Sequence, residues 1–175
     1  MKSLRFCLLT FLAASLSFFS ACGYTNKMVL PRNLKTLHVN TFQNKMILDN
    51  IYAYEPGLEI KITDAVIRRL HVDGNLKIVP REKADAILEG DLLSIDQEGL
   101  RFTGLERIEE YRLYLVVALR LKDAKTGEVL WEEENFTGDA SYFVLGPRAI
   151  SRGEAVEHAT DRLARNIVDR IVEDW

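Results

Sequence analysis

The chain has two cysteines, Cys7 and Cys22, and Cys22 has the surroundings of a modification site. A cysteine thiolate is a nucleophile, so this side chain can accept a covalently attached group. The preceding residues, Ser20 and Ala21, are small and would let a peptidase reach the bond before Cys22. If that bond is cut and Cys22 is modified, no free thiol and no disulfide remain in the folded part. The sequence therefore predicts covalent chemistry at Cys22 and excludes thiol catalysis elsewhere.

The residues before Cys22 have the layout of an export signal. Lys2 and Arg5 supply a positive start, and residues 6–19 are almost wholly apolar. This run is shorter than the roughly 20 residues of a helix that spans a bilayer, and its length is typical of a secretory signal. We predict that residues 1–21 are a cleaved signal peptide and that residues 22–33, with little periodicity, form a tether.

The sequence from Phe19 to Cys22, FSAC, resembles the lipobox of bacterial lipoproteins, although Leu is commoner than Phe at the first position. The resemblance implies that the Cys22 thiol receives a diacylglycerol and that the new amino group is acylated after cleavage. Gly23 in place of Asp is similar to lipoproteins destined for the outer membrane. An ordinary signal peptide with an incidental cysteine is the alternative.

Arginines gather in residues 98–112, where we predict a connection rich in glycine and charge over 98–108. Guanidinium groups bind phosphate in a bidentate manner, so Arg101 and Arg107 are candidate anion-binding residues, with Arg112 beside them. Carboxylates in the same stretch would dilute a positive field; these are Glu98, Glu106, Glu109 and Glu110. A mixed-charge surface loop without a ligand is the alternative interpretation.

The other titratable residues do not form a recognisable catalytic or metal site. Glu154, His158 and Asp161 could share a helix face, but they lack the H-E-x-x-H pattern of zinc sites, and an exposed salt-bridged face explains them equally well. With 23 Lys and Arg against 26 Asp and Glu, and no basic run, the chain is a poor candidate for nucleic-acid binding. We predict a non-enzymatic protein without metal or cofactor.

Period-two patterns predict the strands. Between Tyr111 and Leu121 every second residue is apolar, which indicates a half-buried strand over 111–122. Further strands are predicted over 34–42, 75–80 and 84–97, with Gly90 as a possible bulge, and after a turn at 123–127 through Trp131. Residues 43–50 are predicted to be a loop, and residues 137–147 are predicted to be irregular.

Three- and four-residue spacings predict two helices. The first covers 55–74, with Pro56 at its first position and Gly74 as its stop. The second covers 151–175, where Ser151 and Glu154 make a capping box.

The order of these elements predicts an α+β fold for residues 34–175, a single domain. Two amphipathic helices must bury their apolar faces without leaving a sheet bare, which a two-layer sandwich achieves. We therefore expect one mixed sheet of four to five strands with both helices packed on one face. The other sheet face would be exposed or covered by a partner; Val116 and Ala118 on that face mildly favour a cover.

Several segments in this order resemble the LptE family of lipopolysaccharide-assembly lipoproteins. They are ACGYT at the processing site, LPRNLKTLHVNTFQN, ADAILEGDL, EYRLYLVVALRLKDAKTGEVLWEEENFTGDASY and the terminal amphipathic helix. The resemblance implies a small α/β sandwich, lipid-anchored in the outer membrane and facing the periplasm. It further implies a plug inside a large β-barrel partner that delivers lipopolysaccharide to the outer leaflet, with Arg101 and Arg107 as candidate lipopolysaccharide-binding residues.

Two other functions remain open from the sequence. The first is a periplasm-facing lipoprotein of similar fold that assists secretion or peptidoglycan synthesis. The second is an enzyme acting on envelope polymers, which would require a cleft with shifted titratable groups.

Overall fold

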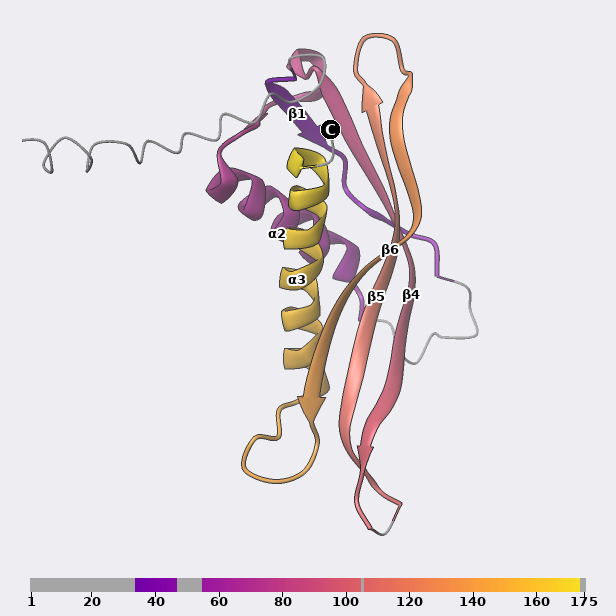
Figure 1. Ribbon diagram of the computed structural model, residues 1–175. Coiled ribbons are helices and arrows are strands. Elements are labelled where there is room, and N and C mark those ends of the chain that lie inside the picture. Colours follow the sequence, from indigo (N-terminus) through magenta and orange to yellow (C-terminus); the bar gives the residue numbers. More distant parts are fainter. Residues whose placement is uncertain (1–33, 47–54, 105, 174–175) are drawn as a thin grey trace, which may run out of the picture.

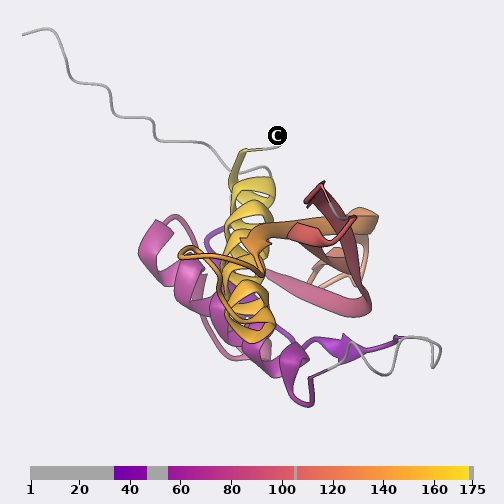
Figure 2. The same ribbon diagram turned by 90° about the horizontal axis from the view of Figure 1, so that it is seen from below.

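The computed structural model describes residues 34–46, 55–104 and 106–173, and Figures 1 and 2 show their arrangement. Cys22, the predicted signal peptide 1–21 and the predicted tether 22–33 lie outside the described residues. No helix within the described ranges is long and apolar enough to cross a membrane.

Three long antiparallel strands form most of the sheet (Figure 1). They are β4 (Ala86–Phe102), β5 (Ile108–Asp123) and β6 (Val129–Phe143). In β5 the alternate residues from Leu113 to Leu121 are buried, because they face the helices, and their neighbours are half-buried. The prediction of a half-buried strand at 111–122 is confirmed.

Short parallel strands complete one side of the sheet. β1 (Thr36–Val39) pairs with both β3 (Lys77–Ile78) and β4, so the order is β3-β1-β4-β5-β6. β2 (Gln43–Asn44) also pairs with β4, although its residues fall in a predicted loop, and the described sheet therefore has six strands. The predicted mixed sheet is confirmed, with one short strand more than the expected four to five.

Gly90 is not a bulge, contrary to the prediction. The register of β4 against β5 shifts between Leu92 and Ser94 instead. A Cβ atom at Gly90 would lie 2.2 Å from the ring of Phe42, which is buried. Glycine at this position therefore makes room for an aromatic side chain of the core.

Both helices lie on one face of the sheet, as predicted (Figure 2). α2 (Leu58–Asp73) begins later than predicted, because Pro56 lies in a turn and Gly57 precedes the first helical residue in a left-handed conformation. Gly74 ends this helix with φ 77°, and its N–H donates to the Leu70 carbonyl. A short 3-10 helix, η4 (Arg81–Lys83), follows β3.

The second helix, α3 (Arg152–Glu173), packs directly on β6. Its start is capped, since the Glu154 N–H donates to Ser151 Oγ at 3.1 Å. The sheet approaches so closely that a Cβ atom at Gly138 would lie 2.5 Å from the Leu163 Cα. The Asn166 side chain also donates to the Thr137 carbonyl of this edge strand at 3.0 Å.

β6 itself continues to Phe143, so the prediction of an irregular stretch over 137–147 is wrong for its first part.

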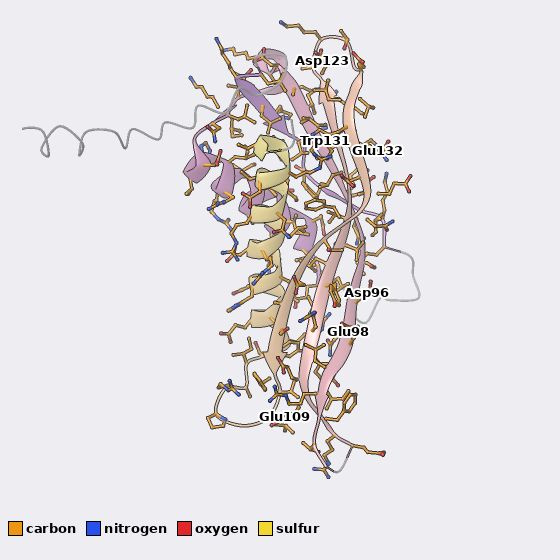
Figure 3. The ribbon with its side chains drawn as sticks, viewed as in Figure 1. Asp96, Glu98, Glu109, Asp123, Trp131 and Glu132 are labelled. Atoms are coloured by element: carbon orange, nitrogen blue, oxygen red, sulfur yellow. The ribbon has the colours of Figure 1, made fainter. Side chains whose placement is uncertain are left out.

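The sheet face away from the helices is charged. Lys122 Nζ lies 2.6 Å from Glu89 Oε2, Arg120 pairs with Glu132, and the Tyr114 hydroxyl donates to Glu98 at 2.6 Å. Figure 3 shows Asp96, Glu98 and Glu132 pointing away from the helices. The described residues Val116 and Ala118 are half-buried within this network. A partner that covers this face stays a prediction.

Candidate functional site

The connection between β4 and β5 is shorter than the sequence predicted. β4 extends to Phe102 and β5 begins at Ile108, so Arg101 lies in a strand rather than in a loop, and the described residues between the strands are 103–104 and 106–107. The turn is closed by the Thr103 N–H, which donates to the Arg107 carbonyl at 2.8 Å. Glu106 adopts a positive φ of 59° within it. The two predicted arginines therefore lie at the same end of the hairpin, one in β4 and one in the turn.

Arg101 belongs to a row of side chains that crosses three strands. It pairs with Glu110 of β5, which in turn pairs with Phe143 of β6. The Arg101 Nε lies 3.6 Å from Glu110 Oε2, and its guanidinium lies 5.7 Å from the centre of the Phe143 ring. Arg101 is therefore partly neutralised and held against an aromatic face.

A second guanidinium contacts the same ring from the connection between β6 and α3. Arg148 lies 4.3 Å from the centre of the Phe143 ring. Backbone hydrogen bonds hold this connection beside the hairpin, because Val144 N–H donates to the Glu109 carbonyl and Ile150 N–H to the Phe143 carbonyl, both at 3.0 Å. Sequence reasoning missed Arg148, and residues 137–147 carried no strand pattern that would have linked it to Arg101.

Large apolar side chains are exposed at this end of the molecule. Leu100, Phe102 and Leu145 are 40%, 58% and 47% exposed. We call these three residues, together with Arg101, Arg107 and Arg148, the arginine tip. Both connections that contribute to it lie at the lower end of the molecule in Figure 1.

Charges at the arginine tip nearly balance. Glu106, Glu109 and Glu110 are nearby in sequence, and Figure 3 shows Glu109 at this end. Arg107 and Arg148 are exposed, and neither has a carboxylate within 4.0 Å among the described residues. The tip can therefore present two unpaired guanidinium groups beside apolar surface, a combination suited to an anion that carries an apolar chain.

Two stacked tyrosines form the base of the arginine tip. The rings of Tyr111 and Tyr142 are 5.8 Å apart. Burial raises the pKa of Tyr142, so its hydroxyl stays protonated and neutral at physiological pH. This end of the sheet is therefore a packed platform rather than a loose hairpin end.

The remaining residues that the sequence singled out lie elsewhere. Arg112 is on the charged sheet face, 3.7 Å from Asp139. His158 lies 4.0 Å from Glu154 on α3, as an exposed pair. Within the part of the chain that the structure describes, no group of three or more His, Cys, Asp or Glu residues could hold a metal ion.

The layered fold places this protein in a structural class that contains solved bacterial proteins. It is similar to the uncharacterized lipoprotein B from Nitrosomonas europaea, with a TM-score of 0.57 and 17% identity over 85% of this chain and 88% of that one. It is also similar to the hypothetical protein CT253 from Chlamydia trachomatis, with a TM-score of 0.52 and 14% identity over 79% and 95%. At these identities the likeness shows the fold alone.

The family is given by the sequence comparison. The model of the LptE family, described as lipopolysaccharide-assembly, matches residues 34–175, and the chain belongs to this family. No curated protein matches the chain significantly. The resemblance seen in the sequence is thus confirmed, and membership indicates a role in lipopolysaccharide assembly.

Proposed function

We propose that this protein is a non-catalytic outer-membrane lipoprotein that plugs the β-barrel of the lipopolysaccharide translocon. In this role it supports assembly of the barrel and aids delivery of lipopolysaccharide to the outer leaflet. The observation that carries the proposal is the LptE family match over residues 34–175. The arginine tip adds a surface chemistry that fits the ligand.

Lipopolysaccharide joins phosphate groups to acyl chains, and the arginine tip offers partners for both. Arg107 and Arg148 lack a carboxylate within 4.0 Å among the described residues and could bind phosphate, with Arg101 beside them. Leu100, Phe102 and Leu145 would contact the acyl chains. Since the local charges nearly balance, affinity would come from paired guanidinium hydrogen bonds and apolar burial rather than from net charge.

Binding of purified lipopolysaccharide to the full chain in non-ionic detergent tests this role. Arg107→Gln combined with Arg148→Gln should weaken binding about tenfold or more, since a charge-assisted hydrogen bond contributes roughly 1.5–3 kcal/mol. Arg81→Gln is the matched control, because Arg81 is an exposed arginine in η4. Equal affinity of the double variant and the control would refute the ligand assignment.

The lipid anchor is the second part of the proposal. Three acyl chains on Cys22 would hold the protein on the membrane without a spanning segment, since each buried methylene contributes about 0.8 kcal/mol. Cys22→Ala should release the protein from membranes during a carbonate wash. A variant that stays with the membrane fraction would show that the anchor lies elsewhere.

The barrel partner distinguishes the proposal from the alternative, an accessory lipoprotein of secretion or peptidoglycan synthesis. Depletion of this protein should lower the level of the correctly assembled barrel on a non-reducing gel and reduce surface lipopolysaccharide. Affinity purification from solubilised outer membranes should also recover the barrel. Normal barrel levels and recovery of a different partner would favour the alternative.

A further inference from the structure

A hollow lies where α2 crosses α3, on the side of the molecule away from the sheet. Its volume is about 350 Å³, and its walls include Arg68, Arg69 and Val72 of α2 and Asp161 and Arg165 of α3. We call it the helix-crossing hollow. Three guanidinium groups and one carboxylate thus line it, in a chain whose formal net charge is −3.

Two of these arginines have no internal ion pair. Neither Arg68 nor Arg165 has a carboxylate within 4.0 Å among the described residues, whereas Arg69 lies 4.0 Å from Asp169. The Nε atom of Arg69 is buried and has no acceptor in the described part of the chain. That atom is too buried to reach a ligand, so the guanidinium groups of Arg68 and Arg165, one from each helix, are the ones that can bind an oxygen-rich anion.

A second hollow of about 370 Å³ continues the first along the helices and shares Arg68 and Asp161 with it. Asp64 and Glu157 line this second part together with Lys61. These carboxylates would repel an acidic peptide laid along the groove, but they can accept hydrogen bonds from hydroxyl groups. Guanidinium and carboxylate groups together line the two hollows, which fits a ligand with one anionic group and several hydroxyls.

We propose that the helix-crossing hollow binds a phosphorylated sugar, with Arg68 and Arg165 on the phosphate and Asp161 on the sugar hydroxyls. Guanidinium groups match phosphate oxygens in a bidentate manner, and the volume lies at the lower end of small-ligand pockets. The site is separate from the arginine tip and does not depend on the proposed function. The sugar phosphate could be free or part of a larger glycan.

Calorimetric titration of the full chain in non-ionic detergent tests the hollow, with glucose 1-phosphate, inorganic phosphate and glucose as probes. We expect saturable binding of glucose 1-phosphate at millimolar concentrations and none of glucose. Arg68→Gln and Arg165→Gln should each weaken it about tenfold, while Arg81→Gln should not. Asp161→Asn should weaken glucose 1-phosphate relative to inorganic phosphate, because it removes a hydroxyl acceptor while also removing a charge that repels both anions.

Three results would overturn the inference. They are the absence of saturable binding, equal affinity for glucose, and unchanged affinity in both arginine variants with unaltered melting temperatures. If Arg68→Gln or Arg165→Gln does not fold, the lysine variants replace them, and these should bind more weakly than the wild type because lysine lacks the planar fork. Binding of a delipidated, phosphorylated oligosaccharide in place of glucose 1-phosphate would identify a glycan as the source. Arg107→Gln with Arg148→Gln should leave this titration unchanged, which separates the hollow from the arginine tip.

Discussion

Replacing Gly138 with alanine should push α3 away from the sheet. An added Cβ atom would lie 2.4 Å from the Leu163 Cβ and 2.5 Å from both its Cα and its backbone nitrogen. Two of these three atoms belong to the backbone, so a change of rotamer cannot relieve the overlap. Leu163 is fully buried, and the helix around it must shift as a unit.

The expected loss follows from this geometry. Overpacking a core usually costs about 1–3 kcal/mol of unfolding free energy. We expect a loss near the upper end of this range, because the added Cβ atom meets backbone atoms of Leu163, which cannot move independently of the helix. A loss of about 3 kcal/mol corresponds to a fall in melting temperature of roughly 10 °C for a domain of this size. Urea unfolding followed by circular dichroism measures the loss directly, as a lower midpoint at an unchanged slope.

Two comparisons make the prediction specific. Gly104→Ala is the matched control, because no atom of the described residues lies within 4 Å of its added Cβ atom, and it should change stability by less than about 0.5 kcal/mol. Leu163→Ala should not rescue Gly138→Ala, since it leaves the obstructing backbone in place. A loss below about 0.5 kcal/mol for Gly138→Ala, or rescue by Leu163→Ala, would refute the described packing of α3 on β6.

Three further predictions concern stability. The Thr36 hydroxyl and then the Lys35 N–H donate to the Asp85 carboxylate and lower its pKa, so its stabilisation is present above the unfolded pKa of about 3.9 and is lost as pH falls through the folded value. Asp85→Asn should cost about 0.5–1.5 kcal/mol at neutral pH, because solvent screens this carboxylate. It should also reduce the loss of stability that the wild type shows as the pH falls; an unchanged loss would contradict this. Ser151→Ala removes the α3 cap and should cost about 1 kcal/mol in urea unfolding, whereas a neutral effect would show that the cap is not needed. Leu119→Ala, at a fully buried site, should cost about 2–5 kcal/mol, and a smaller loss would place Leu119 outside the core.

The strength of each local pattern explains which elements could be predicted. The alternation from Tyr111 to Leu121 and the spacing of the last helix were sufficient to locate β5 and α3, because one face of each is buried in a continuous core. The second half of β6 was missed for a physical reason. The period-two pattern requires a large apolar side chain facing the helices at position 138. The chain has Gly138 there, because the backbone of α3 at Leu163 occupies the space of a side chain.

The candidate site was predicted only in part. Arg101 and Arg107 are near each other in sequence, so a single hairpin brings them to one end. Arg148 reaches the same end through the connection after β6, and its contact with Phe143 depends on hydrogen bonds between segments far apart in the chain. The helix-crossing hollow likewise joins Arg68 and Arg165 from two helices, and local sequence could not place them together.

The sequence by itself determined the two-layer α+β class and the family, because periodicity and motif order are local properties of the chain. Its predictions for Cys22 rest on local sequence as well, and they lie outside the described residues. Only the tertiary structure decided which arginines share a surface. Which arginines lie together depends on the register of the strands and on where the two helices cross. Both are set by how side chains pack between the sheet and the helices, and not by the spacing of residues along the chain.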